Sequence, residues 1–425
     1  MDPRTRQLLE RRRRLLGPNV PTFYREPVEI RRAEGVWMWD AAGRRYLDAY
    51  NNVPHVGHGH PRVVEAICRQ SAELNTHSRY LHPLLLDYAE RLTARLPEGL
   101  DGFLPTCTGS EANDVAIRMA WAATGRRGLI ATDATYHGNT HLVSQLSTRR
   151  PPLGGRAPWV RLVPAPEGPE DAARFAAEVA AAAEALEAEG HGLAALVLCP
   201  FLANEGFPPV GPGFFDDAIA AVRRAGGVVI ADEVQPGFGR LGRWFWGHAR
   251  AGFVPDIVTL GKPMANGYPV AAVVARPELL AAFREAFGYF NTYAGNPVGM
   301  AAAMAVLDVL EAEDLPARAA ATGDAAREGL EALAARHPLI AEVRGEGLFF
   351  GAVLRDPASG APAGEAAAEV IEAMRARGVL MGVIGPANNI LKIRPPLPFG
   401  REELALLLER LDEALSEVEA AMGAA

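Results

Sequence analysis

Two lysines stand out in a chain that otherwise carries its positive charge as arginine. The sequence has 425 residues and 43 lysines and arginines together, of which only Lys262, in VTLGKPMANGYPV, and Lys392, in NILKIRPPLPF, are lysines. An amine can lose its proton and attack a carbonyl carbon, whereas a guanidinium, with its very high pKa, cannot. The two lysines therefore either escaped a compositional bias or serve a chemistry that arginine cannot perform.

Other polar residues follow apolar runs that read as buried strands. GVVIADEVQPGFGR ends such a run in Asp232 and Glu233, and DIVTLGKP ends one in Lys262. FLPTCTGSEANDVAIRMA leads through Gly109 and Ser110 into a helix, whose free N–H groups and positive dipole end suit a phosphate. Because ligands of open α/β sheets bind at the carboxyl ends of the strands, these stretches are the first candidates for a site.

A lysine, an acid and a phosphate cradle are the parts that hold pyridoxal 5′-phosphate (PLP). The lysine forms a Schiff base with the aldehyde, and the carboxylate keeps the pyridine nitrogen protonated, so that the ring accepts electrons from a breaking bond. Each part alone also has a plain structural explanation, since a Gly-Ser helix start is commonly an N-cap and a strand-end aspartate commonly caps a loop.

The elements that must position these residues follow an α/β pattern. Residues 61–310 alternate helices with continuous apolar runs such as GLIATD, LAALVLC and GVVIADE, which predict a large domain with a buried, mostly parallel sheet. Residues 311–425 predict a smaller α+β domain. Residues 1–60 predict a cover segment, with a charged helix and an antiparallel ribbon that turns at Gly35 and at Ala42 and Gly43.

Composition excludes several classes of function. The formal net charge is −8 and the only basic run is RRRR at 11–14, so we expect no nucleic-acid surface. Cys68, Cys107 and Cys199 lack metal-ligand or disulfide spacing, which fits a reducing cytoplasm. The longest apolar stretch, GLAALVLCPFLA, is too short and broken to span a bilayer. We expect no membrane partner and a cytoplasmic enzyme.

The same stretches resemble a known family. GVVIADEVQPGFGRLGRWF followed by PDIVTLGKPMANGYPVAAVVA is similar to the signature of the class III (omega-) aminotransferases of PLP-dependent fold type I, and CTGSEANDVAIRMA, TYHGNT, NTYAGNPVGMAAAMAVLDVLE and VRGEGLFFGAVL match further blocks in order. The resemblance spans essentially the whole chain. It implies an α/β fold, PLP as cofactor, and transfer of an amino group from a primary amine or omega-amino acid to a keto acid.

The resemblance assigns roles around the cofactor ring. Lys262 matches the Schiff-base lysine, which also moves the proton between the substrate carbon and the cofactor. Asp232 matches the partner of the pyridinium nitrogen. Val234 and Tyr136 match the residues that pack on the two faces of the ring, and Gln235 matches the residue that contacts its phenolic oxygen.

Further roles concern the phosphate and the entrance. Gly109 and Ser110 match the phosphate loop, and Thr292 matches a threonine that reaches the phosphate from the neighbouring subunit. The resemblance thus implies a homodimer whose active sites are shared between subunits. Tyr80 is expected to face the substrate entrance, although a packed surface aromatic would explain it equally well.

Several positions depart from the family pattern and bear on the substrate. Cys199 and Pro200 stand where many relatives have Glu-Pro, and Asn204 stands where many have a glutamate that pairs with a substrate-binding arginine. That arginine, in the motif R-x-x-P-P-L, falls at Lys392, with Arg394 two residues on. Lys392 and Arg394 are therefore the candidate substrate-binding residues, although an ammonium holds an anion without the bidentate fork of a guanidinium.

One subgroup of the family looks particularly close. NNVPHVGHGHP, LNTHSRYLHP and NILKIRPPLPF resemble a subgroup that includes ethanolamine-phosphate phospho-lyases, which eliminate phosphate. In both reactions the lysine deprotonates the substrate carbon, after which either the cofactor carbon is protonated or a β leaving group departs. The sequence leaves this choice open. We favour transamination, because the subgroup also contains plain aminotransferases.

Three histidines near the N-terminus could suggest a metal. His55, His58 and His60 are spaced closely enough for imidazoles to ligate zinc. Their match to the N-terminal segment of the family favours hydrogen bonding or pocket lining, and we expect no metal site.

Overall fold

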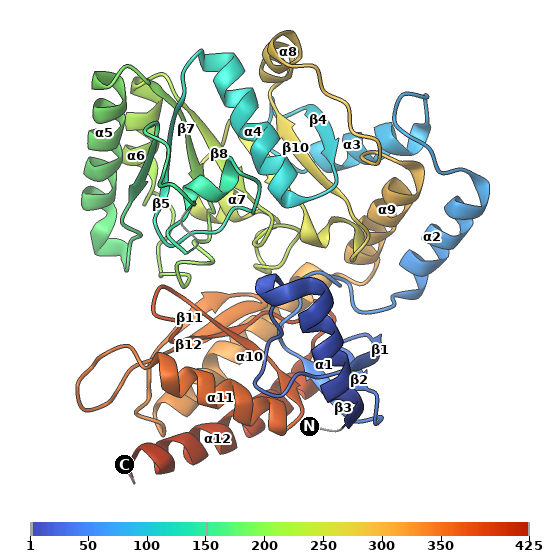
Figure 1. Cartoon of the computed structure of the whole chain (residues 1–425), viewed down its shortest axis with the longest axis vertical. Helices are drawn as coiled ribbons and strands as arrows, with labels where there is room; N and C mark the ends of the chain where they lie inside the picture. Colours follow the sequence, from blue (N-terminus) through green and yellow to red (C-terminus); the bar gives the residue numbers. More distant parts are fainter. Residues whose placement is uncertain (1–2, 150–151, 424–425) are drawn as a thin grey trace.

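The chain folds into two layered parts joined by a long helix. The computed structural model describes residues 3–149 and 152–423. In Figure 1 the large sheet and its helices lie above, and the C-terminal part lies below together with the N-terminal segment. The joining helix, α9 (Pro297–Ala312), is buried over most of its length.

A seven-stranded sheet forms the centre of the upper part. Its order is β4-β10-β9-β8-β7-β5-β6. The strands are β4 (Gly102–Thr106), β5 (Gly128–Thr132), β6 (Val160–Val163), β7 (Leu193–Leu198), β8 (Val228–Asp232), β9 (Ile257–Leu260) and β10 (Ala271–Ala275). Strands β6, β5, β7, β8 and β9 are parallel, whereas β10 is antiparallel to β4 and to β9. The predicted mostly parallel sheet is confirmed.

Helices cover both faces of this sheet, as the apolar strand runs require. Leu196 and Leu198 of β7 pack in one apolar cluster with α5 (Ala172–Ala188) and α6 (Asp216–Arg224), while Ala195 and Val197 pack in another with α4. Because side chains alternate across a strand, the two clusters lie on opposite faces. The remaining helices of this part are α2 (Pro61–Glu73), α3 (Pro83–Thr93), α4 (Gly109–Thr124), α7 (Gly247–Ala251) and α8 (Pro277–Ala286).

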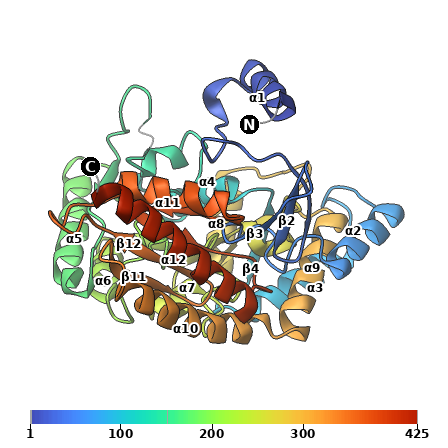
Figure 2. The same cartoon turned by 90° about the horizontal axis from the view of Figure 1, so that it is seen from below.

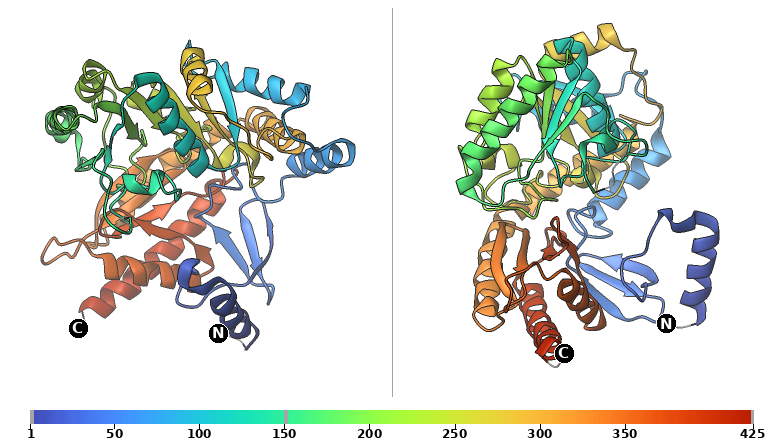
Figure 3. Two further views of the ribbon diagram at one scale, coloured as in Figure 1. Left: turned by 45° about the horizontal axis from the view of Figure 1, so that its top comes forward. Right: turned by 60° about the vertical axis from the view of Figure 1, so that its left-hand side comes forward.

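The N-terminal ribbon is tied to the C-terminal part. Strands β1 (Ile30–Glu34), β2 (Trp37–Asp40) and β3 (Arg45–Asp48) form the predicted antiparallel ribbon, and both turns use glycines with positive φ, Gly35 and Gly43. Strand β3 then pairs in parallel with β13 (Val379–Leu380). The charged helix α1 (Pro3–Leu16) has no buried residue and lies at the edge of the molecule, outside the sheets, in Figures 2 and 3.

The C-terminal part is a second, antiparallel sheet with helices on it. Its order is β11-β12-β15-β14. The strands are β11 (Ile340–Glu346), β12 (Phe349–Leu354), β14 (Gly382–Ile384) and β15 (Ile390–Ile393), and the helices are α10 (Leu315–Ala334), α11 (Gly364–Ala376) and α12 (Arg401–Gly423). Figure 2 shows α11 and α12 lying alongside each other. Among the described helices, none combines the length and apolar composition that a bilayer crossing requires.

Candidate active site

The predicted cofactor stretches meet at one cavity. This cavity, of about 390 Å³, opens beyond the carboxyl ends of β8 and β9. It is lined by all of the predicted cofactor-binding residues except Thr292, namely Gly109, Ser110, Tyr136, Asp232, Val234, Gln235 and Lys262. Strand ends that are distant in the sequence thus bring a lysine, an acid and a helix N-terminus to one place.

Lys262 is the second residue after the end of strand β9. Gly261 separates it from the strand, and the 3-10 helix η4 (Lys262–Ala265) begins at it. Its side chain is exposed to solvent within the cavity that it lines. The surrounding protein still removes part of the water from the amine, which lowers the pKa of Lys262 to about 8, with a further lowering by the charge of Arg394 and an opposing effect of Asp232. A substantial neutral fraction is therefore present near neutral pH, as a nucleophilic amine requires.

Asp232 is fixed in orientation at the end of β8. Its Oδ2 accepts hydrogen bonds from His137 Nδ1 at 2.6 Å and from Asn113 Nδ2 at 3.1 Å, and its Oδ1 accepts from the backbone N–H of Val234 at 3.0 Å. Asn113 is itself held by the hydroxyl of Thr259, which donates to Asn113 Oδ1 at 2.7 Å. A buried carboxylate held in this way can face a protonated ring nitrogen without rotating.

Two of these supporting residues were missed by sequence reasoning. His137 directly follows Tyr136 in the stretch TYHG, and Asn113 lies one helical turn after Ser110 in α4. Both stretches were already candidates from the sequence. The signal that could have identified these two residues was a polar side chain close to a residue with an assigned role. Their side chains donate to the carboxylate of Asp232 from two different elements, Asn113 from helix α4 and His137 from the loop after β5.

The start of α4 forms a cradle for a phosphate. Thr108 caps the helix by accepting from the N–H of Glu111 at 3.1 Å, so that Gly109 and Ser110 present the first turn to the cavity. Close approaches demand glycine here. A Cβ on Gly138, whose φ is +141°, would lie 2.5 Å from the Ser110 hydroxyl oxygen, and one on Gly109 would lie 3.0 Å from Val234.

These groups fit PLP. The amine of Lys262 suits an aldehyde, the carboxylate of Asp232 suits a pyridinium nitrogen, and the N-terminus of α4 suits a phosphate. Because Gly109 and Gly138 have no Cβ, no side chain from these two positions fills the space between the three groups. The residues that would hold the group are therefore present in one cavity of suitable size.

A group of cations lies beside this cavity. Lys392 on β15 and Arg394 just after it are both buried, and both donate to Gln235 Oε1, Lys392 from Nζ at 3.4 Å. Arg394 also donates from Nε and Nη2 to the carbonyl of Tyr50, at 3.4 Å each. The charge of Arg149 acts on Lys392 as well. We call Lys392, Arg394 and Arg149 the cation corner.

Burial perturbs every charge in the cation corner. It holds the pKa of Lys392 well below its ordinary value, and the charges of Arg394, Lys262 and Arg149 lower that pKa further. Burial also lowers the pKa of Arg394 to about 10 and lowers that of Arg149, which the nearby Glu205 opposes. Within residues 3–149 and 152–423, no ion pair joins a cation of this corner to a carboxylate.

Arg149 was not identified from the sequence. It lies in the loop after the 3-10 helix η2 (Val143–Leu146) and donates to three carbonyls, those of Ala134 at 3.0 Å, Asn204 at 2.9 Å and Gly385 at 3.0 Å. These carbonyls belong to three separate loops, two in the upper part and one in the lower. Only the tertiary fold brings these loops together, so no local sequence pattern indicates a role for Arg149.

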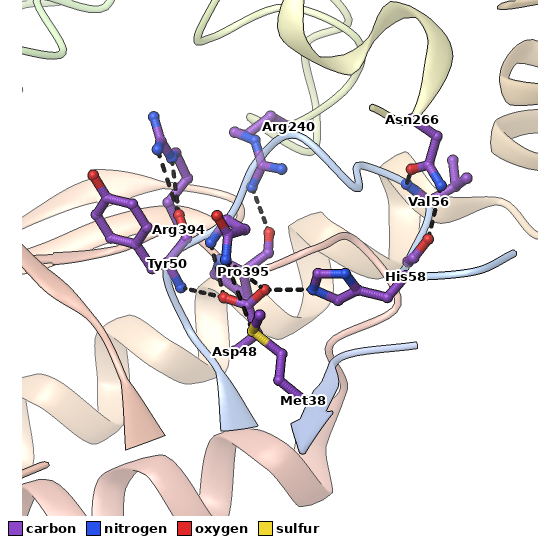
Figure 4. Close-up of polar contacts among 11 residues, drawn as sticks. Met38, Asp48, Tyr50, Val56, His58, Arg240, Asn266, Arg394 and Pro395 are labelled. Atoms are coloured by element: carbon purple, nitrogen blue, oxygen red, sulfur yellow. Dashed lines mark hydrogen bonds and ion pairs between the residues drawn. The ribbon is translucent and has the colours of Figure 1, made fainter. Parts of the chain in front are cut away.

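The N-terminal segment helps to place Arg394. Figure 4 shows Asp48 accepting from the N–H of Tyr50 at 3.0 Å and contacting His58 Nε2 at 2.7 Å, while the Tyr50 carbonyl faces Arg394. The same view shows Arg240 reaching the carbonyl of Pro395. A buried acid of the ribbon thus fixes the backbone that holds a cation of the small sheet.

The three N-terminal histidines form separate hydrogen bonds, in line with the interpretation preferred from the sequence. His55 Nε2 contacts the carbonyl of Phe238 at 2.7 Å, His58 contacts Asp48, and His60 contacts Glu313 at 3.0 Å. Across the part of the chain that is described, no group of three or more His, Cys, Asp or Glu residues is arranged to hold a metal ion.

Besides Lys392 and Arg394, two further predicted residues lie outside the lining of the cofactor cavity. Thr292 lines an adjacent cavity of about 490 Å³, which shares Cys107, Tyr268 and Pro269 with the first. Tyr80 is 66% exposed and stacks on His77, with ring centroids 5.1 Å apart. A single chain does not bring either residue to the cofactor groups. Both assignments stay predictions, and that of Thr292 concerns the site of a neighbouring subunit.

The positions that depart from the family pattern are buried near the site. Asn204 donates to the carbonyl of Tyr136 at 3.4 Å. Its neighbour Glu205 accepts from the hydroxyl of Thr132, and its other oxygen has no partner. Burial, followed by the charges of Glu205 and Asp232, holds the pKa of Cys199 well above its ordinary value. The acid in this region is therefore at Glu205, one residue beyond the position compared.

Comparisons with known proteins cover nearly the whole chain. Residues 21–415 match the family described as Aminotransferase class-III. The chain is 38% identical to an alanine–glyoxylate aminotransferase 2-like protein of Drosophila melanogaster, covering 97% of this chain and 87% of that protein. It is 36% identical to ethanolamine-phosphate phospho-lyase homolog 1 of Caenorhabditis elegans, covering 96% and 93%. A solved phospholyase from Arthrobacter in complex with phosphoethanolamine superposes with a TM-score of 0.93 at 42% identity, covering 96% and 99%.

Proposed function

Because this chain belongs to the class III aminotransferase family of PLP-dependent enzymes, we propose that it eliminates phosphate from a small O-phosphorylated amino alcohol such as ethanolamine phosphate. The observation that carries the proposal is the cation corner: within the described residues, its buried Lys392 and Arg394 and its more exposed Arg149 form no ion pair with a carboxylate. PLP, when bound, supplies an aldehyde that captures the substrate amine and a ring that accepts electrons from a breaking bond.

The chain's own residues divide the work at the cofactor cavity. Gly109 and Ser110 bind a phosphate at the start of α4, and Asp232 holds a proton on the ring nitrogen. Lys262 binds the aldehyde and afterwards takes the proton from the substrate carbon that bears the amine. Val234 and Tyr136 also line the cavity and would pack against the ring.

The charge of the cation corner favours a phosphate over a carboxylate. A buried charge is costly unless an opposite charge meets it. A phosphate monoester brings up to two negative charges and three acceptor oxygens, whereas a carboxylate brings one charge. The amide of Asn204, in the column where many relatives have a glutamate, is neutral, and the charge of the adjacent Glu205 acts on Arg149 without forming an ion pair with it. In a substrate with an amine on one carbon and a phosphate on the next, the amine can react at the cofactor cavity while the phosphate binds the cation corner.

A second candidate is transamination between a primary amine or omega-amino acid and a keto acid. It is favoured by the 38% identity to the alanine–glyoxylate aminotransferase 2-like protein, and it begins with the same proton transfer to Lys262. A monocarboxylate held by Lys392 and Arg394 would leave part of the positive charge uncompensated. For this reason the geometry favours elimination, which the sequence alone had placed second.

One assay separates the two reactions. Inorganic phosphate and alanine are measured after incubation of the PLP-loaded protein with ethanolamine phosphate, with and without pyruvate. Elimination predicts phosphate release at the same rate in both mixtures and no alanine. Alanine that forms only with pyruvate, with no phosphate released, would establish transamination and overturn the proposal.

We further propose a homodimer with shared active sites. Large apolar side chains are exposed at the cavity that contains Thr292, where Tyr293 lines the cavity and Phe290 packs on its lining residue His77, and clustered exposure of this kind marks an interface. Light scattering measures the mass. Mixing Lys262→Ala chains with Thr292→Ala chains then restores activity if Thr292 serves the partner's site, and restores none if it serves its own.

We also propose that the protein works in the cytoplasm. Cys68, Cys107 and Cys199 are all free thiols, and free thiols persist in reducing compartments. Fractionation of the source cells with an antibody against the chain tests this location.

A further inference from the structure

Lys392 lies among cations. Its Nζ is 3.4 Å from Gln235 Oε1 and 5.6 Å from the centroid of the Phe349 ring. The titratable groups that act on it are Arg394 just after its own strand, Lys262 from η4, Arg149 from the loop after η2, and the thiol of Cys199. Two buried acids, Asp232 and Glu205, act on its neighbours Lys262 and Arg149. An amine in this setting gives up a proton readily.

Phosphate elimination creates a demand for such a proton. When the C–O bond of a phosphate monoester dianion breaks, the phosphate would leave as a trianion, which is a poor leaving group, unless an acid protonates it. The guanidiniums of Arg394 and Arg149 bind anions but are poor proton donors. Lys262 is engaged with the substrate carbon, and His137 is bonded to Asp232 and to the hydroxyl of Thr135. Lys392 is the remaining titratable cation of the corner.

We propose that Lys392 is the general acid that protonates the departing phosphate, an inference that rests on the proposed elimination. Lys262 takes the proton from the amine-bearing carbon, and the electrons left there form a carbon–carbon double bond as the adjacent C–O bond breaks. The phosphate leaves with the C–O electron pair and accepts a proton from the Lys392 ammonium. The products are hydrogen phosphate and a neutral Lys392, which regains a proton from water.

Substrate binding prepares this acid. Before binding, the surrounding cations disfavour the charged form of Lys392. A phosphate dianion placed against it raises the pKa of Lys392, so the amine gains a proton when the substrate arrives. An acid whose pKa lies near the working pH is the most effective donor. The same position occupied by arginine would bind the anion and would not donate, which explains why the second lysine stands here.

The test uses two leaving groups of nearly equal shape. Ethanolamine O-sulfate releases sulfate, which leaves as a stable dianion without a proton, whereas ethanolamine phosphate needs one. With the PLP-loaded Lys392→Arg variant, we expect kcat for phosphate release to fall by about 10²-fold or more, with KM within about threefold. We expect kcat for sulfate release to change by less than about threefold. Equal losses for both substrates would make Lys392 a purely positioning residue and overturn the proposal, as would an unchanged kcat for phosphate.

A binding measurement checks the charge of Lys392 without catalysis. Inorganic sulfate does not titrate near neutral pH, so calorimetry in buffers of different ionisation enthalpy reports protons taken up by the protein. We expect proton uptake on sulfate binding to the wild-type holoenzyme, and none for Lys392→Arg, which is already charged. Equal proton uptake in both proteins would contradict the proposal. If wild-type protein releases no phosphate in the assay above, the proposed elimination itself fails, an outcome distinct from an active wild type with an indifferent Lys392→Arg.

Discussion

Lys262 and Lys392 differ in the elements that carry them and in the charges around them. Lys262 follows a strand of the parallel sheet and has Asp232 nearby, whose charge raises its pKa against the effect of burial. Lys392 lies within the antiparallel sheet of the other part, where the nearby charges are positive and lower its pKa further. Two identical side chains at one site are thereby set to different proton affinities, which is how a single site can hold both a base and an acid.

Of the variants that test this comparison, Lys262→Ala is expected to lose the most activity. We expect Lys262→Ala to lower kcat by at least about 10⁴-fold, because the variant loses both the attachment of the cofactor and the base. Borohydride should fix no PLP to this variant. Lys392→Met is the matched control and should still carry PLP that borohydride fixes. Covalently fixed PLP in Lys262→Ala would contradict the distinction between the two lysines.

Removing the acid beside Lys262 should have the next largest effect. An amide at residue 232 cannot hold a proton on the ring nitrogen, so we expect Asp232→Asn to lower kcat by about 10²- to 10³-fold while PLP stays attached. The pKa of Lys262 in the PLP-free variant should fall below the wild-type value of about 8, since the charge that raises it is gone. Asp324→Asn, on an exposed aspartate paired with Arg243, is the control and should change kcat by less than about twofold. Full activity of Asp232→Asn would break this part of the account.

Removing the Lys392 amine should affect stability in a pH-dependent way. In the unfolded chain Lys392 binds a proton up to pH about 10.4, whereas the folded chain releases it at a lower pH. Between these two pKa values the unfolded state binds more protons, so the wild type gains stability as pH rises. We expect Lys392→Met to stabilise the PLP-free protein at neutral pH. The gain should be about 1.4 kcal/mol for each unit by which folding lowers the pKa of Lys392 in the wild type. This advantage should disappear near pH 10.4.

Denaturant unfolding of PLP-free protein from pH 7 to 10 measures this effect. Lys262 titrates in both proteins, so the cost of its own burial is common to them, whereas its coupling to Lys392 is part of the measured difference. Lys392→Arg keeps a buried charge and should show no such gain. A Lys392→Met variant that is less stable at pH 7, or whose advantage is independent of pH, would show that Lys392 is an ordinary lysine.

The cofactor side of the site could be predicted far more completely than the cation corner. Gly109, Asp232 and Lys262 each stand at the end of an apolar strand run, so local pattern and the rule for ligands in open sheets were enough to place them together. Lys392 and Arg394 were noticed because they depart from a motif. Their burial against Gln235 depends on how the two parts of the chain pack.

Residues that reach the site through tertiary contacts could not be predicted from the sequence. Arg149 is held by carbonyls of three separate loops, and the parallel pairing of β3 with β13 joins segments from the two ends of the chain. Neither arrangement has a local periodic signal. The ribbon turns at Gly35 and Gly43 were predicted because glycine at a positive φ leaves a local mark.

The charge of Lys392 can be read directly because the chain has only two lysines. Labelling lysine with ¹³C at Cε gives two resonances, and the one lost in Lys392→Met belongs to this residue. The account predicts that in the PLP-loaded protein this resonance titrates well below the ordinary lysine value of about 10.4, and that inorganic sulfate shifts it at neutral pH to the charged position. A Lys392 signal that titrates near 10.4 and ignores sulfate would contradict the assignment of two different roles to the two lysines.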